Sequence, residues 1–152
     1  MPDGSAMAEL IQPNPLPRRR RVLVLAMSPA QLLDITGPVE VLSQAGWRHA
    51  SERAHATSAR PSRLYDVAFH MVGGTATSSG LPLTSTISEQ ELLIGPPFDT
   101  VIVVGGEGAL RRGADPALQR LVRHLAPRAR RVVGVCTAPS SWRKPASCGA
   151  GR

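Results

Sequence analysis

The sequence predicts an α/β domain built on an open parallel sheet with flanking helices. Three short apolar runs, at residues 21–26, 100–104 and 132–135, are rich in valine and leucine. Such runs are typical of strands that are buried on both faces of a sheet. Segments with helical features separate the runs, and strands that alternate with helices favour a parallel α/β fold. A length of 152 residues is enough for one such domain.

The segment after the first strand predicts a turn followed by a helix. Residues 28–36 are expected to form the turn, and Gly37-Pro38 is expected to open the helix. Proline is favoured at the first helical position because its missing N–H would have no partner there. Gly46 is the predicted end of this helix. Residues 48–63 are polar and rich in arginine and serine, so we expect a surface loop there.

Two further segments with regular structure are predicted between residues 65 and 95. Residues 65–72 alternate apolar and polar side chains, which predicts a half-buried strand with Val67, Phe69 and Met71 on one face, ending at Gly73-Gly74. Residues 80–95 are expected to hold a short extended segment and a helical turn.

The helix before the last strand has the clearest start and stop signals. Asp115-Pro116 predicts its beginning and Pro127 its end. Between them one apolar stripe recurs at helical spacing, formed by Leu118, Leu121, Val122 and Leu125.

The basic charge of the chain lies mainly at its two ends. The net charge is +7, but residues 22–137 contain 11 arginines against 9 acidic residues. Residues 1–20 are rich in proline and arginine and are expected to be a disordered leader. The Arg18–Arg21 run is interpreted as a solvated arm, with contact to nucleic acid as the alternative.

Several classes of protein are disfavoured by composition. The sequence has no apolar run of about 18 residues or more, so no membrane-spanning helix is predicted. Two cysteines do not predict a disulfide framework. The four histidines show no spacing typical of metal ligands, and we expect neither a metal nor a cofactor. A cytoplasmic protein is the expectation.

The candidate site is predicted where the strands end, because ligands of open α/β sheets bind outside the carboxyl ends of the strands. Asp34 follows the first strand, Gly105-Gly106 follow the strand at 100–104, and Cys136-Thr137 follow the last strand. The sequence Gly134-Val-Cys-Thr resembles a nucleophile elbow, a sharp strand-to-helix turn that exposes a nucleophile. A helix N-terminus there would favour the thiolate of a cysteine. We expect the thiol to face Asp34 from an adjacent strand.

Each of these features also has a simpler interpretation. A cysteine at the end of a strand is often a small buried hydrophobic residue. Asp34 can serve as a cap for a turn, and two glycines after a strand are common in loops. If the site is functional, the N–H groups of Gly105 and Gly106 are candidates to stabilise an anion.

Three motifs together resemble one protein family over residues 21–137. They are Leu-Leu-Asp-Ile-Thr-Gly-Pro-Val-Glu-Val at 32–41, Val-Val-Gly-Gly-Glu-Gly at 103–108, and Gly-Val-Cys-Thr at 134–137. They resemble the ThiJ/PfpI superfamily, which has a class I glutamine amidotransferase-like fold, a flavodoxin-like three-layer sandwich. Residues 27–34 are most similar to the N-terminal domain of GlxA-type, AraC-family transcriptional regulators. Isonitrile hydratase carries very similar motifs.

The resemblance implies roles for individual residues. Cys136 matches the reactive cysteine, Asp34 the acidic residue that approaches it, and Thr137 the threonine that follows it. Gly105, Gly106 and Glu107 are the expected ligand-binding residues. Members with protease-type activity have a histidine after the cysteine, and Thr137 at that position argues against peptidase chemistry.

Two functions follow from the resemblance as expectations. The first is the ligand-sensing domain of a regulator that is cut off before its helix-turn-helix region. Such a protein would bind an unidentified small molecule, form a homodimer when full-length, and contact DNA only through the missing region. The second is an isonitrile hydratase-like lyase with a cysteine nucleophile. A carbonyl-stress or chaperone-like role is a weaker third interpretation.

The end of the chain departs from the family pattern. Residues 138–152 contain two prolines and no amphipathic period. Loss of one nucleotide after the Thr137 codon would explain this, because the restored frame can encode GAFLLAEAGLL, an apolar helix. We therefore expect the C-terminal part of the fold to be missing and the tail to be out of frame, with a natural divergent tail as the alternative. The absent helix would bury about five large side chains, worth about 10 kcal/mol, so at best marginal folding is expected, with one sheet face uncovered.

Overall fold

The computed structural model describes residues 18–54 and 64–137, and for 46–54 it describes the backbone alone. Most of the predicted leader and the whole predicted tail lie outside these residues. The described elements are, in chain order, β1 (Arg20–Met27), α1 (Leu32–Ala54), β2 (Tyr65–Val72), α2 (Glu89–Ile94), β3 (Thr100–Val104), α3 (Glu107–Arg112), α4 (Pro116–Arg128) and β4 (Arg131–Val135).

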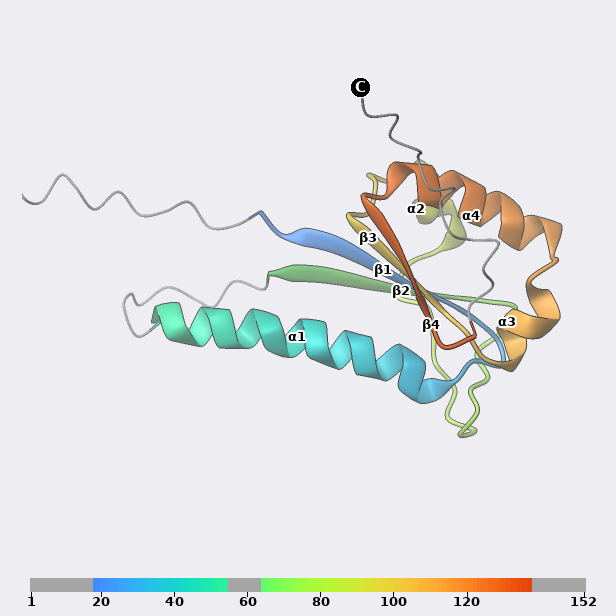
Figure 1. Cartoon of the computed structure of the whole chain (residues 1–152), viewed down its shortest axis with the longest axis horizontal. Coiled ribbons are helices and arrows are strands. Elements are labelled where there is room, and N and C mark those ends of the chain that lie inside the picture. Colours follow the sequence, from blue (N-terminus) through green and yellow to red (C-terminus); the bar gives the residue numbers. More distant parts are fainter. Residues whose placement is uncertain (1–17, 55–63, 138–152) are drawn as a thin grey trace, which may run out of the picture.

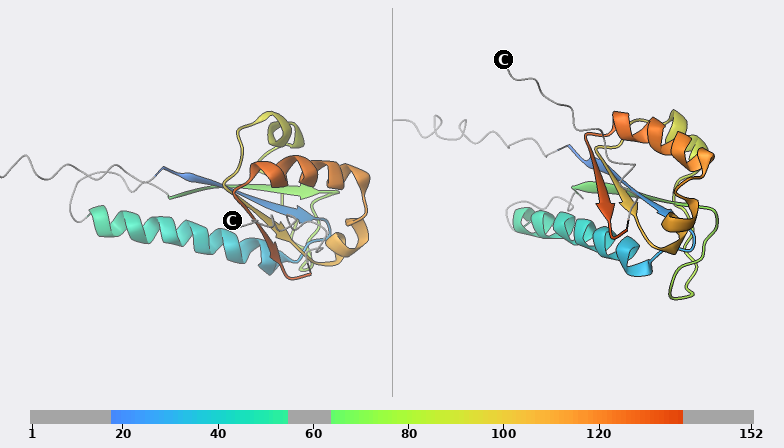
Figure 2. Two further views of the ribbon diagram at one scale, coloured as in Figure 1. Left: turned by 45° about the horizontal axis from the view of Figure 1, so that its top comes forward. Right: turned by 45° about the vertical axis from the view of Figure 1, so that its right-hand side comes forward.

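The strands form one four-stranded sheet in the order β2-β1-β3-β4, and all pairs are parallel. This confirms the predicted fold class. Helix α1 covers one face of the sheet, while α2 and α4 lie on the other (Figure 1; Figure 2). The three layers arise because each connection between parallel strands must cross a face of the sheet.

The sheet is held by side chains that alternate between two cores. Toward α2 and α4 point Leu23, Leu25 and Met27 of β1, which pack with the apolar stripe of α4. Toward α1 point Val22, Val24 and Ala26, which pack with Ile35 and other residues. All six β1 side chains are 2% exposed or less. Full burial of a Leu or Val contributes about 1.5–3 kcal/mol, so β1 is the centre of the fold.

Helix α4 confirms its predicted start and its buried face. Asp115 is the N-cap, and its side chain accepts a hydrogen bond from the backbone N–H of Ala117 at 2.8 Å. The four residues of the predicted stripe are 1–7% exposed. The predicted stop at Pro127 is wrong by one residue, since α4 runs to Arg128. A proline in the last turn removes only one hydrogen bond, and the buried stripe outweighs that loss.

Helix α1 differs from its prediction at both ends. It begins at Leu32 instead of Gly37 and continues past Gly46 to Ala54, so Pro38 lies inside it. Residues 32–36, predicted as a turn, are helical because burial of Ile35 at 3% exposure stabilises the first turn. The predicted loop at 48–63 is helical up to Ala54.

Two short helices complete the described fold. The predicted turn within 80–95 is α2, which starts with a capping box formed by Ser88 and Glu91. The hydrogen bond from the Ser88 side chain lowers the pKa of Glu91. Helix α3, which follows Gly106 directly, was not predicted from the sequence.

The outer strand β4 is less covered than predicted. Strands β1 and β3 are buried on both faces, whereas Val133 of β4, on the α1 face, is 40% exposed. Helix α1 lies over β1 and β2, so the expectation of an uncovered face applies to β4 alone. Across 18–54 and 64–137, no helix has both the length and the apolar character needed to cross a bilayer.

Candidate site at the carboxyl ends of the strands

Three segments meet at the carboxyl edge of the sheet. They are the β1–α1 connection at 28–31, the glycines after β3, and the turn after β4. The connections from β1 and β3 leave toward opposite faces, since α1 covers one face and α4 the other. Such a switch of direction between neighbouring strands is where ligands of α/β sheets bind. The geometry therefore supports the predicted location.

Cys136 has the backbone geometry of a nucleophile elbow. Its φ angle is +60°, in the left-handed region that costs a non-glycine residue about 1–2 kcal/mol. The residue is exposed and its thiol is free. The interpretation of Cys136 as a buried hydrophobic residue is therefore wrong. Its Sγ lies 3.9 Å from the hydroxyl oxygen of Thr137, to which it donates.

The Gly105-Gly106 pair connects this elbow to the start of α1. The Gly105 N–H donates to the carbonyl of Val135 at 3.0 Å. The Gly106 N–H donates to the Thr137 hydroxyl at 3.2 Å. A Cβ on Gly106, whose φ is +105°, would lie 3.1 Å from the backbone N of Gln31. A residue that brings these backbones together must lack a side chain.

The N–H of Gly106, predicted to stabilise an anion, is thus already bonded to Thr137. Glu107, predicted to bind ligand, is exposed at the start of α3 and pairs with Arg111 one turn later. Arginine at this spacing competes with any ligand for the carboxylate. The ligand-binding role of these residues stays a prediction.

Gly108, the last residue of the 103–108 motif, has a structural role that was not predicted from the sequence. A Cβ there would lie 2.2 Å from the carbonyl oxygen of Met27, and the Gly108 N–H donates to the Pro29 carbonyl at 2.9 Å. Helix α3 therefore rests directly on the end of β1. The spacing Gly-Gly-x-Gly at 105–108 was the signal that could have indicated it.

Asp34 is the third residue of α1, so its interpretation as a cap in a turn is wrong. Its Oδ2 atom is buried and has no hydrogen-bond partner in the described part of the chain. A buried polar atom without a partner costs about 1–3 kcal/mol. Asp34 therefore has a buried acceptor atom without a donor among the described residues.

The expectation that the thiol and carboxylate extend from adjacent strands is wrong. Strand β3 lies between β1 and β4. The Gly105-Gly106 turn fills the intervening position, in contact with Thr137 on one side and Gln31 on the other. The two residues need not extend from adjacent strands. The turn after β3 bridges the segments that carry them, because it contacts both the elbow after β4 and the residues before α1.

A loop between β2 and α2 also packs at this edge, and its place there was not predicted from the sequence. Ala30 pairs with Thr77 in a short parallel bridge. The Ser28 hydroxyl accepts from the Ala76 N–H at 3.1 Å, and the Leu32 N–H donates to the Ser78 hydroxyl at 3.3 Å. The serine- and threonine-rich run after Gly73-Gly74 was the signal for this loop.

The described residues offer a thiol and a carboxylate at this edge, without an imidazole beside them. His70 is buried in β2 with its Nδ1 2.9 Å from the Ile87 carbonyl, and His124 pairs with Arg128 on α4. Among residues 18–54 and 64–137, no cluster of three or more His, Cys, Asp or Glu side chains is arranged to hold a metal ion.

A parallel α/β sheet with a cysteine in a strained strand-end turn defines the class of this protein. A family model described as "DJ-1/PfpI family" matches residues 20–144. The chain belongs to the DJ-1/PfpI family, which confirms the ThiJ/PfpI resemblance at this level. It is also similar to a Streptomyces lividans protein named "Uncharacterized protein in cpoL 5'region". The two are 31% identical over 122 residues, which cover 77% of this chain and 73% of the relative.

Proposed function

We propose that this chain carries the ligand-sensing domain of a GlxA-type, AraC-family transcriptional regulator. In this proposal a small molecule binds at the carboxyl edge of the sheet in a cytoplasmic protein. The full-length regulator is a homodimer, and its DNA contacts are made by a helix-turn-helix region that these residues do not include.

The observation that carries the proposal is the buried Oδ2 atom of Asp34, which has no hydrogen-bond partner among residues 18–54 and 64–137. Folded proteins rarely leave a buried carboxylate oxygen without a donor. A small molecule that donates a hydrogen bond to Asp34 would recover that free energy. Because Asp34 lies in the first turn of α1, binding there would also alter the packing of this long helix.

The elbow itself supports sensing over catalysis. A catalyst of this kind uses backbone N–H groups that are free to bind the developing negative charge. Here the Gly106 N–H already donates to Thr137, and the same hydroxyl accepts from the Cys136 thiol. The Gly106 N–H and the Thr137 hydroxyl are thus already hydrogen-bonded, and the Gly106 N–H is not free to bind a negative charge.

The alternative is an isonitrile hydratase-like lyase, which the exposed thiol in a strained turn favours. The thiolate of Cys136 would add to the isonitrile carbon while Asp34 supplies or accepts the proton. Thr137 would hydrogen-bond the adduct. Water would then release an N-substituted formamide and regenerate the thiol.

A turnover experiment separates these functions. The purified chain and its Cys136→Ser variant are incubated with an alkyl isonitrile, and formamide is followed by NMR. The regulatory proposal expects no turnover by either protein. Turnover that is lost in Cys136→Ser would refute it and establish the lyase.

The binding role has its own test. A thermal-shift screen of metabolites compares the chain with Asp34→Asn and with Glu40→Gln, an exposed carboxylate on the same helix. Ligands that stabilise the chain and Glu40→Gln, but not Asp34→Asn, would support the proposal. Stabilisation that is equal in all three would contradict it. The coding DNA downstream of residue 137 offers a further test when it is translated in the shifted frame. Helix-turn-helix units there would favour the regulator, whereas an early stop codon would favour the lyase.

A further inference from the structure

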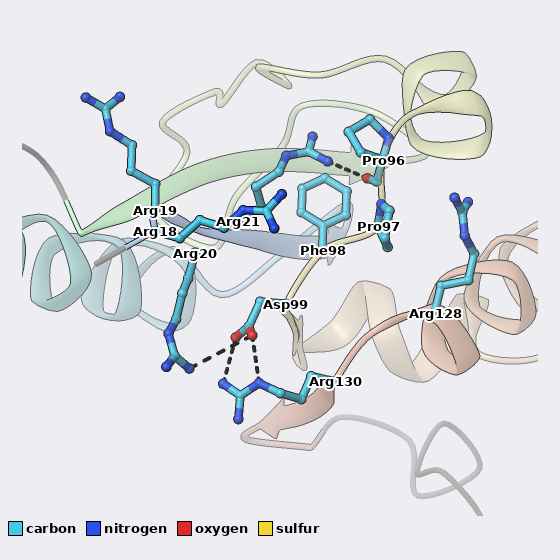
Figure 3. A pocket seen from close by; sticks show the side chains of 10 residues that line it. All are labelled: Arg18, Arg19, Arg20, Arg21, Pro96, Pro97, Phe98, Asp99, Arg128 and Arg130. Atoms are coloured by element: carbon cyan, nitrogen blue, oxygen red, sulfur yellow. Dashed lines mark hydrogen bonds and ion pairs between the residues drawn. The ribbon is translucent and has the colours of Figure 1, made fainter. Parts of the chain in front are cut away.

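A groove of about 580 Å³ lies at the amino-terminal edge of the sheet, opposite the edge at which β4 ends before Cys136. Figure 3 shows the side chains that line it. Its walls come from the start of β1, the segment before β3, and the end of α4 with the residue before β4. Six of its ten lining residues are arginines: Arg18, Arg19, Arg20, Arg21, Arg128 and Arg130. They are one third of the 18 Lys and Arg residues of the chain. The other four are Pro96, Pro97, Phe98 and Asp99.

One wall of this arginine groove is held by Asp99. Its carboxylate accepts two hydrogen bonds from Arg130, at 2.7 and 2.9 Å, and lies 3.9 Å from Arg20. Such bidentate pairs fix a guanidinium in one orientation. Asp99 therefore positions two arginines while compensating only one of their charges.

A second wall is formed by Arg21 and the ring of Phe98. The guanidinium carbon of Arg21 lies 4.3 Å from the ring centroid, and Arg21 also donates to the Pro96 carbonyl. The Oδ2 atom of Asp66, an exposed residue, lies 3.9 Å from the Nε atom of Arg21. On the far side Arg128 donates to the carbonyl of Gly95 at 3.1 Å. These arginines are ordered mainly by neutral acceptors, so their charge remains free to attract an anion.

Arg18 and Arg19 complete the groove and have no ion pair or hydrogen bond within the described residues. Both are exposed. The interpretation of Arg18–Arg21 as a solvated arm is therefore incomplete, because Arg20 and Arg21 belong to β1 and have partners. Six cations face one lining carboxylate, in a chain whose body is nearly neutral.

Several guanidinium groups around a small hollow repel one another unless an anion lies between them. Guanidinium forks match phosphate oxygens in geometry and charge. A volume of about 580 Å³ is within the range of small-molecule sites. We propose that the arginine groove binds a small polyphosphate anion, free or as part of a nucleoside triphosphate.

The backbone of a nucleic acid offers the same phosphate chemistry. The structure favours the small anion because the six arginines line a single hollow of about 580 Å³ that also includes Phe98. Duplex DNA needs phosphate contacts spread along a surface. This groove is independent of the function proposed for the carboxyl edge.

The test uses the purified 152-residue chain and inorganic tripolyphosphate, with affinity measured by calorimetry at low salt. Arg18→Gln/Arg19→Gln removes the two exposed cations that precede β1, so folding should be unaffected, as far-UV circular dichroism would verify. Loss of two charges should weaken binding roughly tenfold, and added salt should weaken it further. The matched control is Arg120→Gln/Arg123→Gln, two exposed arginines of α4 outside the groove, with little expected change.

Several outcomes would overturn the proposal. If both double variants lose the same affinity for tripolyphosphate, binding depends only on the net charge of the chain, as it would for an unfolded chain. No measurable binding, or binding unaffected by Arg18→Gln/Arg19→Gln, would also refute the site. Tighter binding of a short duplex DNA than of tripolyphosphate or a nucleoside triphosphate would assign the groove to nucleic acid instead. A nucleoside triphosphate that binds more tightly than tripolyphosphate would support the proposal and add the nucleoside to the ligand.

Discussion

Replacement of Gly108 by alanine tests whether α3 rests directly on β1. The added Cβ would lie 2.2 Å from the carbonyl oxygen of Met27, 2.6 Å from its carbonyl carbon and 2.7 Å from the carbonyl carbon of Ser28. Ordinary contacts are 3.4–4 Å, so α3 must move away from the strand end. All three atoms are backbone, and no side-chain rotation can relieve the overlap.

The magnitude follows from three contributions. Overpacking of a tight contact costs about 1–3 kcal/mol, and weakening of the 2.9 Å bond from Gly108 to Pro29 costs about 1 kcal/mol more. Alanine recovers about 1 kcal/mol through its higher helix propensity. We expect Gly108→Ala to lower the free energy of unfolding by about 2 kcal/mol.

The measurement is urea unfolding followed by far-UV circular dichroism, with the same buffer in all samples. Gly37→Ala in α1 is the control, because a Cβ at that position would have nothing within 4 Å. Alanine gains helix propensity at position 37, but its Cβ clashes with the ring of the following Pro38. The net change in the free energy of unfolding should therefore stay below about 1 kcal/mol. A Gly108→Ala variant as stable as the unaltered chain would refute the contact, as would equal losses in the two variants.

Three further predictions concern single side chains. Asp115→Ala should destabilise the chain by about 1 kcal/mol in the same urea assay, because it removes the N-cap of α4, while Asp115→Asn should retain most of the stability; equal effects would contradict capping. The hydrogen bonds from Arg130 hold the pKa of Asp99 at about 2, below its usual 3.8, despite partial burial. The stability that Asp99 contributes should be complete above pH 3.8 and be lost as the pH falls toward about 2. Urea unfolding at several pH values across this range would measure that loss, and Asp99→Asn should abolish it. Cys136→Gly should be about 1 kcal/mol more stable than Cys136→Ala, because only glycine adopts a φ of +60° without strain; equal stabilities would mean that the elbow is unstrained.

Elements that depend on local sequence pattern were predicted correctly, whereas helix boundaries that depend on tertiary contacts were not. Strands β1 and β3 were predicted from continuous apolar runs and the buried stripe of α4 from apolar periodicity. Both patterns agree with the fold because burial is their cause. The start of α1 was predicted five residues too late because Gly37-Pro38 is a helix-start signal, whereas burial of Ile35 stabilises an earlier first turn in the structure. Tertiary packing, which local propensity does not contain, made the difference.

The candidate site shows the same division. The positions of Cys136 and Gly105-Gly106 at strand ends were predictable, because parallel strands place their carboxyl ends at one edge. The bond from Gly106 to Thr137 and the close approach of Gly108 to Met27 were not, since they depend on distances between segments far apart in the chain. The charge run at Arg18–Arg21 was visible, but its partner Asp99 lies in another segment, before β3.

The central place of β1 determines how the chain must be assembled during translation. This strand leaves the ribosome before either neighbour, yet its partners begin only at Tyr65 and Thr100. Residues 22–27, apolar throughout, therefore stay uncovered until most of the domain has been synthesised. Pairing over such sequence separations is slow, and the nascent chain presents a six-residue hydrophobic segment to chaperones or to other chains during that interval.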